Sequence, residues 1–480
     1  MNYRMISRML GMALLTEAVL MIPSLIIALY HGESILGFSA AMGSMVALGL
    51  AGLSRKPESN DIYAREGFVT VSLCWIVLSA LGALPFYIEG ITPTYVDALF
   101  ETVSGFTTTG ASILPAVEGL PYGILFWRSF THWIGGMGVL VFMMAVLPLA
   151  DNRSMHIMRA EVPGPVVGKL VPRAKDSALI LYGIYVALTI IEVIFLLFGG
   201  MPLFDAFVHA MGTAGTGGFG IKNNSIAYYN SAYIDVVISV FMLLFSINFN
   251  LYFFVLLGNI RAVAKNEELR WFLCIVGAAV LAIALNIRDL YGSFGEAVRY
   301  SLFQVGTVVS TTGYSTADFN QWPELSRALL VGLMLMGACA GSTGGGMKVS
   351  RIMILIKSAS CEIRRMMHPR SVNLVKLEGK SVSDEVVRNT LIFFVMYMFL
   401  IVGSTVLVAC FDECSFTTNL TSVIACISNI GPGLEAVGPM GNFGFFSPIS
   451  KIVLTLNMLI GRLEIFPMIM LFHANTWKRV

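Results

Sequence analysis

Charged residues are scarce in this chain of 480 residues: Lys, Arg, Asp and Glu make up 12% of it, whereas hydrophobic residues make up 56%. So little charge excludes a soluble globular protein, whose surface must be hydrated. The net charge of only +2 leads us to expect no nucleic-acid partner. The polar and apolar alternation of an outer-membrane barrel is also missing. An all-α protein that crosses the lipid bilayer many times remains, because helices satisfy their own backbone groups.

The sequence also lacks the short patterns that mark catalytic and metal sites. It has no HExxH, no pair of CxxC motifs and no G-x-S-x-G. Its six histidines are scattered, and its seven cysteines lie mostly in apolar segments as small packing residues. Cys410 and Cys414 could form a bridge, but their spacing leaves this open. We therefore expect a protein that is not an enzyme and holds no organic cofactor.

Long apolar runs are what the chain has instead, and ten of them are candidate membrane spans. They lie near residues 9–30, 36–53, 68–88, 123–149, 178–200, 232–260, 271–287, 325–356, 389–411 and 447–474. The first run follows Arg4 and Arg8, as in a signal peptide. It is long and lacks a small-residue cleavage site, so we expect it to be retained.

The charged residues are sorted between the connections. Lys and Arg gather at both termini and near residues 54–66, 151–177, 261–270 and 348–388. Positively charged connections face the cytoplasm, so both termini are predicted to be cytoplasmic. The remaining connections are mostly acidic and include Asp97, Glu101 and Asp318. Such residues outside would concentrate cations at an entrance, although outward acidic residues also follow from topology alone.

Four Ser/Thr/Asn-rich turns that close on glycine are the most informative feature of the sequence. Their closing glycines are about 110, 95 and 120 residues apart, which suits one helix pair and one connection per turn; they are Gly110, Gly218, Gly313 and Gly431. Segment 95–107, before the first turn, is too short to span lipid but apolar enough to enter it, so we predict a descending helix and an extended return. Four such loops would give rings of carbonyl oxygens that can replace the hydration shell of a monovalent cation. One such turn alone would be an ordinary loop.

Two features near the predicted turns concern the inner side of the pathway. A glycine-rich break interrupts the run 325–356 at Gly341, Ser342, Thr343, Gly344, Gly345 and Gly346. A broken helix at membrane depth must face protein or water, so we predict an intramembrane loop beneath the turns, with a helix-packing surface as the alternative. Arg462 lies inside the last apolar run, where a charge needs a cavity or a partner. A purely structural role for it is the alternative.

Longer motifs in the chain resemble those of the Trk-type potassium uptake family, within the superfamily of Trk, Ktr and plant HKT transporters. They are THWIGGMGVLVF at 131–142, FNLYFF at 249–254, GACAGSTGGGMKVSR at 337–351 and GRLEIFP at 461–467. The resemblance covers nearly the whole chain. It implies an N-terminal helix hairpin and four pseudo-symmetric helix–pore loop–helix repeats around one ion pathway. The implied boundaries are 1–66 for the hairpin and its linker, then 67–152, 153–265, 266–383 and 384–480 for the repeats.

The resemblance also implies roles for single residues. The potassium-binding filter positions that it carries over are Thr108, Thr109 and Gly110; Thr216, Gly217 and Gly218; Thr311, Thr312 and Gly313; and Asn429, Ile430 and Gly431. Repeat 4 departs most from the family pattern, because Asn429 and Ile430 replace threonines and Pro432 stiffens the backbone. In the family, the loop matching 341–346 is a gate, and the arginine matching Arg462 lies close to it below the filter.

The function implied by the resemblance is potassium uptake across the bacterial inner membrane. The implied partners are a second copy of the chain and a cytoplasmic, nucleotide-binding regulatory subunit of the TrkA type. The alternative is symport of potassium with protons or sodium, whose signature would be a membrane-embedded carboxylate in the route. A receptor or scaffold is a third class, but it leaves the four turns unexplained. The basic stretch 348–388 could also bind anionic lipid.

Overall fold

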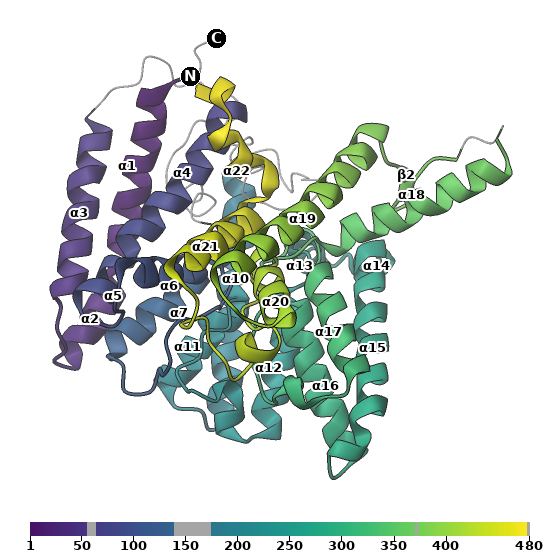
Figure 1. Cartoon of the computed structure of the whole chain (residues 1–480), viewed down its shortest axis with the longest axis horizontal. Helices are drawn as coiled ribbons and strands as arrows, with labels where there is room; N and C mark the ends of the chain where they lie inside the picture. Colours follow the sequence, from purple (N-terminus) through teal and green to yellow (C-terminus); the bar gives the residue numbers. More distant parts are fainter. Residues whose placement is uncertain (55–63, 139–173, 370–372, 478–480) are drawn as a thin grey trace.

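The structure is a computed structural model, and it describes residues 1–54, 64–138, 174–369 and 373–477 (Figure 1). The second half of run 123–149 and most of the basic connections near 54–66 and 151–177 lie outside the described residues. The described chain is helical except for loops and one antiparallel pair, β1 (Lys376–Leu377) and β2 (Lys380–Ser381). The predicted all-α membrane architecture is confirmed.

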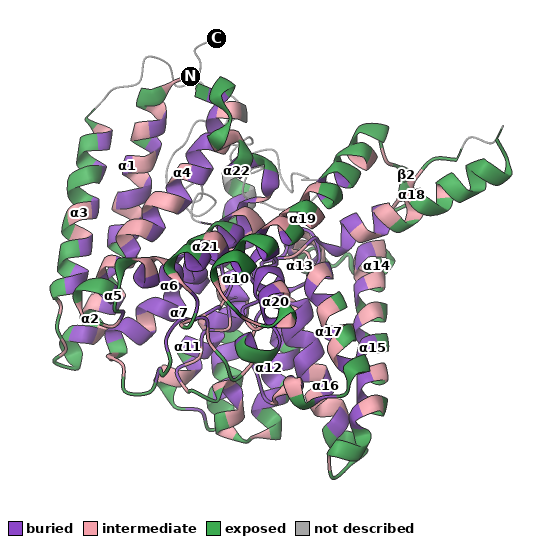
Figure 2. Cartoon of the chain, in the orientation of Figure 1, coloured by how far each residue is buried: buried purple, intermediate pink, exposed green. Residues whose placement is uncertain are grey.

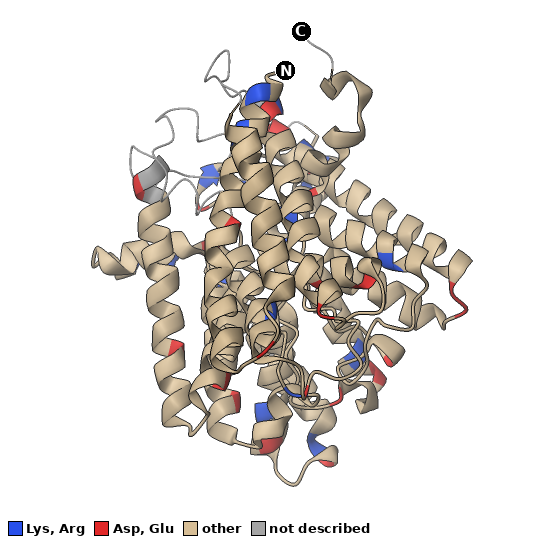
Figure 3. Cartoon of the chain, turned by 90° about the vertical axis from the view of Figure 1, so that its left-hand side faces the viewer, with Lys and Arg blue, Asp and Glu red and all other residues tan. Residues whose placement is uncertain are grey.

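In the described residues, six stretches of helix are long and apolar enough to cross a membrane. They are α1 (Tyr3–Leu20) with α2 (Ile22–Tyr30), α3 (Leu36–Leu53), α4 (Ala64–Gly82) with α5 (Leu84–Ile88), α10 (Ala174–Phe198), α15 (Glu267–Ile287) and α19 (Asp384–Phe411). Figure 3 shows few charged residues along the long helices. The outer face of α19 exposes Val395, Phe399 and Val402. Apolar side chains on an outer face fit contact with lipid rather than water.

The other predicted spans are not single helices in the described residues. Run 232–260 divides into α12 (Ala232–Phe245) and α13 (Phe249–Leu256), bent by 93°. Run 325–356 divides into α17 (Glu324–Met336) and α18 (Val349–Met367), and run 447–474 into α21 (Pro448–Leu463) and α22 (Ile465–Phe472). Two of these breaks bond to each other, since the N–H of Cys339 donates to Ser246 O (3.1 Å) and that of Phe249 to Gly341 O (3.0 Å). The broken backbone is therefore paired inside the protein, as its depth requires.

Four short buried helices occupy the centre of the molecule. They are α6 (Tyr95–Phe106), α11 (Leu203–Gly215), α16 (Phe294–Val309) and α20 (Phe416–Ile427). Each one packs against the helix that follows the turn of the neighbouring repeat: α6 against α21, α11 against α7 (Tyr122–Gly136), α16 against α12, and α20 against α17. These contacts close a ring of four repeats. Figure 2 shows that buried residues dominate this central region and that exposed residues lie on the outer helices.

The N-terminal hairpin packs beside this ring. Helices α1 and α3 approach closely because Gly11 of α1 lies against the backbone of Gly49 and Gly52 of α3. Small residues permit such close helix packing in membranes. Near the start of the chain, the hydroxyl group of Tyr3 in α1 donates to the carbonyl oxygen of Trp477 (2.7 Å), so the first and last described segments lie at the same end of the molecule (Figure 1). The remaining short elements are α14 (Ile260–Lys265), η1 (Ser225–Tyr229), η2 (Arg288–Leu290), η3 (Phe319–Gln321), η4 (Glu435–Val437) and η5 (Ala474–Trp477).

Candidate functional site

The four central helices end in the same backbone motif. In repeat 1, the N–H of Thr108 donates to Gly105 O (3.1 Å) and that of Thr109 donates to Ser104 O (2.9 Å). This pair of bonds defines a Schellman motif, in which the residue after the C-cap is left-handed. The other three repeats repeat both bonds. The left-handed residues are Thr108 (φ 56°), Thr216 (φ 56°), Thr311 (φ 61°) and Asn429 (φ 56°).

Threonine at a left-handed position is strained. Glycine is the usual residue there, and a branched side chain costs about 1–2 kcal/mol in that conformation. Three repeats nevertheless have threonine. Two of the three hydroxyl groups are bonded: Thr216 donates to Gly215 O (2.6 Å), and Thr311 accepts the N–H of Gly345 (2.6 Å). The hydroxyl group of Thr108 is buried and has no partner in the described part of the chain. Strain that recurs at equivalent positions is typical of functional sites.

The closing glycine of each turn lies against the backbone of the next repeat. A Cβ atom on any of them would come within 3.0 Å of the carbonyl oxygen that precedes the next closing glycine, closer than real Cβ atoms approach. The pairs are Gly110 with Gly217, Gly218 with Thr312, Gly313 with Ile430, and Gly431 with Thr109. The order of contacts is 1 to 2, 2 to 3, 3 to 4 and 4 to 1. The turns therefore form a closed ring.

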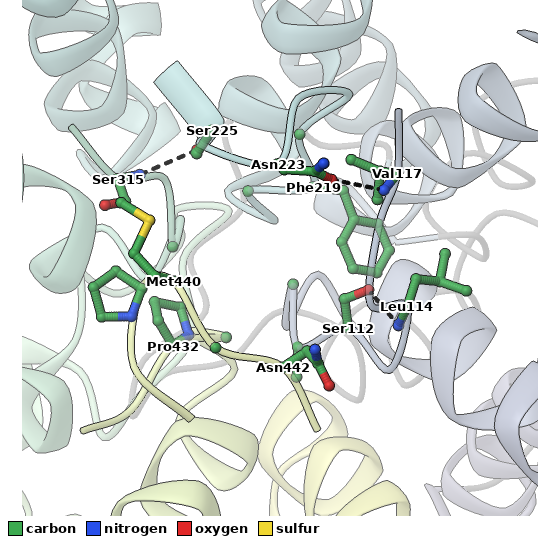
Figure 4. A pocket seen from close by; sticks show the side chains of 18 of the residues that line it. Ser112, Leu114, Val117, Phe219, Asn223, Ser225, Ser315, Pro432, Met440 and Asn442 are labelled. Atoms are coloured by element: carbon green, nitrogen blue, oxygen red, sulfur yellow. Dashed lines mark hydrogen bonds between the residues drawn. The ribbon is translucent and has the colours of Figure 1, made fainter. Parts of the chain in front are cut away.

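The carbonyl oxygens in this ring are free acceptors. Within the described parts of the chain, none of the four receives a hydrogen bond, although the residues that carry them are buried; they are Thr109, Gly217, Thr312 and Ile430. Buried carbonyl groups are rarely left unpaired. A cavity of about 230 Å³ opens onto all four closing glycines at once (Figure 4). Oxygens in this arrangement can coordinate a dehydrated cation.

Side chains behind the ring differ between repeats. The hydroxyl groups of Thr109 and Thr107 lie 2.8 Å apart, and those of Thr312 and Ser310 lie 2.6 Å apart. In repeat 4, the Asn429 amide donates to Thr109 Oγ1 (2.9 Å) and to the Met458 carbonyl (2.9 Å). The asparagine that departs from the family pattern thus joins repeat 4 to repeat 1.

The loops after the turns form a second ring around the cavity mouth. We call this second ring the collar. At least one hydrogen bond joins each neighbouring pair of loops, so the collar is closed. The bonds are Val117 N–H to Asn223 Oδ1 (2.8 Å), Ser315 N–H to Ser225 Oγ (3.2 Å), Glu435 N–H to Asn320 Oδ1 (2.8 Å) and Phe443 N–H to Ser112 O (2.8 Å). Figure 4 shows the first two of these bonds.

The predicted intramembrane loop lies directly against the turns of repeats 3 and 4. Besides the bond from Gly345 to Thr311, a Cβ atom on Gly344 would lie 2.8 Å from Ser310 O, and one on Gly345 would collide with Ser428 O. Both positions therefore require glycine. Ser342 and Thr343 bond to the backbone of Cys339 (2.7 Å) and Phe245 (3.1 Å).

The structure brings Arg462 to this loop. Its guanidinium group is buried and donates to Thr343 O (2.8 Å), Gly135 O (2.5 Å) and Gly136 O (2.8 Å). It thus joins the loop to the end of α7. Glu464, two residues later, instead pairs with Arg351 of α18 (2.6 Å).

Sequence reasoning missed other residues that hold the loop. The ammonium group of Lys348 contacts Gly344 O, and Glu268 accepts the N–H groups of Ala340 (2.8 Å) and Ser350 (3.1 Å). Glu268 lies just before the apolar run 271–287, and Lys348 lies inside the run 325–356. These positions were the available signal, because a charge within or beside an apolar run needs a partner.

The prediction of a free acidic entrance is wrong for Asp97 and Glu101. Both lie on α6 and are buried, and each is neutralised by a basic residue: Asp97 by Lys451 (2.6 Å) and Glu101 by Arg128 (2.6 Å). They face the packed neighbours of α6 rather than water. Asp318 accepts the N–H of Asn320 (3.1 Å).

Two further points of the sequence analysis concern a bridge between two cysteines and a metal site. Cys410 and Cys414 are free thiols in the structure. Among the described residues, no group of three or more His, Cys, Asp or Glu side chains could hold a metal ion.

Comparisons with known proteins give a consistent picture. The family model described as "TrkH: Cation transport protein" matches residues 38–479. The Trk system potassium uptake protein TrkH of Escherichia coli is 35% identical, and the alignment covers 100% of both chains. TrkG of the same organism is 34% identical over 99% of both. The crystal structure of the potassium transporter TrkH from Vibrio parahaemolyticus matches with a TM-score of 0.89 and 32% identity, covering 100% of both chains.

Proposed function

This chain belongs to the TrkH family of cation transport proteins, and on that premise we propose that it takes up potassium as the membrane subunit of a Trk system. The twelve filter positions would bind potassium, which is the transported substrate. The ring of free carbonyl oxygens at the four turns is the observation that carries this proposal. The carbonyl oxygens of such a ring replace the hydration shell of an ion, and no covalent bond is made or broken. No catalytic residue is therefore needed.

The break 341–346 and Arg462 act together as the gate in this proposal. The loop lies against the turns, and the buried guanidinium group is a positive charge next to the route. Such a charge repels a passing cation, while its hydrogen bonds hold the loop in place. Opening requires the loop and Arg462 to separate.

Orientation and partners follow from the family. We propose that the chain lies in the bacterial inner membrane with both termini in the cytoplasm, that it forms a homodimer, and that a TrkA-like nucleotide-binding subunit controls the gate. The gathering of Lys and Arg at the termini and in alternate connections of the sequence supports the orientation, because positively charged connections face the cytoplasm. The four repeats then run from 67–152 to 384–480 in one orientation.

The alternative, symport with protons or sodium, needs an acidic group in the route. The residues that line the described cavity include no Asp or Glu, which favours a channel-like route driven by gradient and membrane potential. The potential supplies about 2.3 kcal/mol per charge per 100 mV.

Flux in reconstituted liposomes tests the function. Purified chain should carry potassium down its gradient, with an unchanged initial rate when a proton or sodium gradient is absent. Flux that requires either gradient would establish symport instead. Absence of any potassium flux, in protein that is folded and inserted, would contradict the proposed function.

A further inference from the structure

A histidine of α7 lies behind the turn of repeat 2 and has no role in the pathway described so far. His132 is completely buried, and its Nδ1 lies 2.9 Å from the carbonyl oxygen of Gly105 on α6. Its ring centroid is 4.2 Å from that of Phe219, the residue after the closing Gly218. The imidazole is therefore wedged between the helix of repeat 1 and the turn of repeat 2.

The imidazole occupies the space of a missing side chain. Repeats 1 and 3 have Thr109 and Thr312 at the second filter position, whereas repeat 2 has Gly217. A Cβ atom on Gly217 would collide with Nδ1 of His132, and one on Gly215 would collide with the His132 carbonyl oxygen. Repeat 2 thus needs glycine because α7 supplies the packing group in its place.

Arg128, one helical turn before His132 on α7, holds the same turn of repeat 2. The Arg128 guanidinium group lies 3.6 Å from the centroid of the Phe219 ring and donates to Gly220 O (2.8 Å). Arg128 is itself held by Glu101 of α6. Phe219 is fully buried in contact with both His132 and Arg128, at the edge of the cavity (Figure 4). Residues 217–220 are therefore positioned by side chains of α7.

The hydrogen bond to Gly105 sets the orientation of the ring. A carbonyl oxygen only accepts, so Nδ1 must carry the proton in this contact. The bond holds the ring plane in one orientation against Gly217. A side chain that lacked a donor at this point would lose the anchor, whereas one with an amide N–H of similar reach would keep it.

We propose that His132 is a specificity-determining residue of the ion pathway. As a positioning residue it sets the place of the repeat 2 backbone, and hence the distance from the Gly217 carbonyl oxygen to the opposite carbonyl groups. This inference rests on the proposed function. It predicts an effect on the choice between ions, beyond an effect on folding.

Potassium and sodium fluxes in liposomes that contain the full-length chain test the inference. His132→Ala should lower the potassium-to-sodium flux ratio about fivefold, which is about 1 kcal/mol at 1.4 kcal/mol per factor of ten. His132→Asn keeps an amide N–H at the position of Nδ1 for Gly105 O and should stay within about twofold of the original ratio. Trp133→Leu is the matched control, since the Trp133 ring packs on Tyr185 of α10 and bonds to Thr189 (3.3 Å). It should leave the ratio unchanged.

A reciprocal pair of substitutions makes the test sharper. Gly217→Ala should lower the ratio in the original background and should lower it much less beside His132→Ala, because removing the ring makes room for the new methyl group. If His132→Ala does not fold, His132→Ser, whose side chain ends before the position of Nδ1 and is too short to reach Gly105 O, replaces it in both experiments.

The outcomes separate the two proposals. An unchanged ratio in His132→Ala, or equal effects of Gly217→Ala in both backgrounds, would overturn the role of His132 while leaving potassium transport intact. No potassium flux through the original chain would instead overturn the proposed function.

Discussion

Glycine is needed at the closing position of each turn for two separate reasons. At Gly313, φ is +91°, which side chains rarely adopt, and a Cβ atom would also collide with Ile430 O. Gly332, on the helix that follows the same turn, has no atom within 4 Å of a Cβ position. The same substitution at the two positions therefore meets a different backbone conformation and different surroundings.

Gly313→Ser should reduce potassium flux and its preference over sodium, because the repeat 4 carbonyl must move to make room. Gly332→Ser should leave both unchanged. Tracer flux of the two ions in liposomes measures the effect. Equal flux ratios in Gly313→Ser and the original chain would remove Gly313 from the filter.

The Glu101–Arg128 pair provides a residue-level test of burial. Glu101→Gln leaves a buried guanidinium group without its counter-charge, which costs about 3–5 kcal/mol. We expect a lower unfolding temperature and the same loss of flux at low and high salt, because buried pairs are poorly screened. Glu324→Gln breaks the exposed pair with Arg327 (2.8 Å) and should cost about 0–1 kcal/mol. A flux loss confined to low salt would restore Glu101 to a role in attracting cations.

At the level of elements, continuous helices could be predicted from the sequence and broken ones only in part. The six long spans stand out because lipid requires an uninterrupted apolar surface. The break after Gly337 was visible as a run of glycines. The bend after Phe245 was not, because its cause is the partner loop that bonds to Ser246 and Phe249. A partner distant in sequence leaves no local signal.

Arg462→Ala should raise basal potassium flux in the absence of the regulatory subunit, because the loop 341–346 loses the group that ties it to α7. One hydrogen bond to a charged group contributes about 1.5–3 kcal/mol, so an increase of about 10- to 100-fold is expected. Arg288→Ala, at an exposed arginine of η2, is the control.

A deletion of Gly345 should also raise basal flux, and the double variant should gain less than the sum of the two effects, because both changes act on one network. Low basal flux in all three variants, with folded protein, would mean that the barrier lies elsewhere. The glycines would then serve helix packing.

Across the whole molecule, the collar ties four loops that are about a hundred residues apart in sequence. Asn320 and Glu435 form its joint between repeats 3 and 4, with Asn320 Nδ2 also donating to Glu435 O (3.2 Å). The hydroxyl group of Ser415 lowers the pKa of the Glu435 carboxyl group. Stability from this ionised group is present above its unfolded pKa and is lost as pH falls through the lower folded pKa.

Asn320→Ala should remove both bonds and lower the unfolding temperature by a few degrees, since each bond contributes about 0.5–1.5 kcal/mol. Asn224→Ala, at an exposed residue of the neighbouring loop, is the control. Thermal unfolding at neutral and acidic pH measures both. If Asn320→Ala matches the original chain at both pH values, the joint does not stabilise the molecule.

The four turns and their arrangement around one pathway could be predicted from the sequence, but the contacts that join one turn to the next could not. Composition and spacing identify each turn, because glycine and threonine mark it locally. Contacts such as Asn429 with Thr109 and His132 with Gly217 join different repeats, and they depend on how the repeats are arranged. In the sequence, His132 is one of six scattered histidines. Its partners are backbone groups and an aromatic ring, and these form no recognisable motif with a histidine.

The closed ring of four turns has a consequence for evolution, because one gene encodes all four quarters. In a pore made of four identical subunits, one mutation changes four positions together and its effect is multiplied. Here a mutation changes one quarter and leaves the other three in place, as the glycine of repeat 2 and the asparagine of repeat 4 already illustrate. Ion preference in such a pathway can drift in small steps, and a harmful change in one quarter can be compensated from the next.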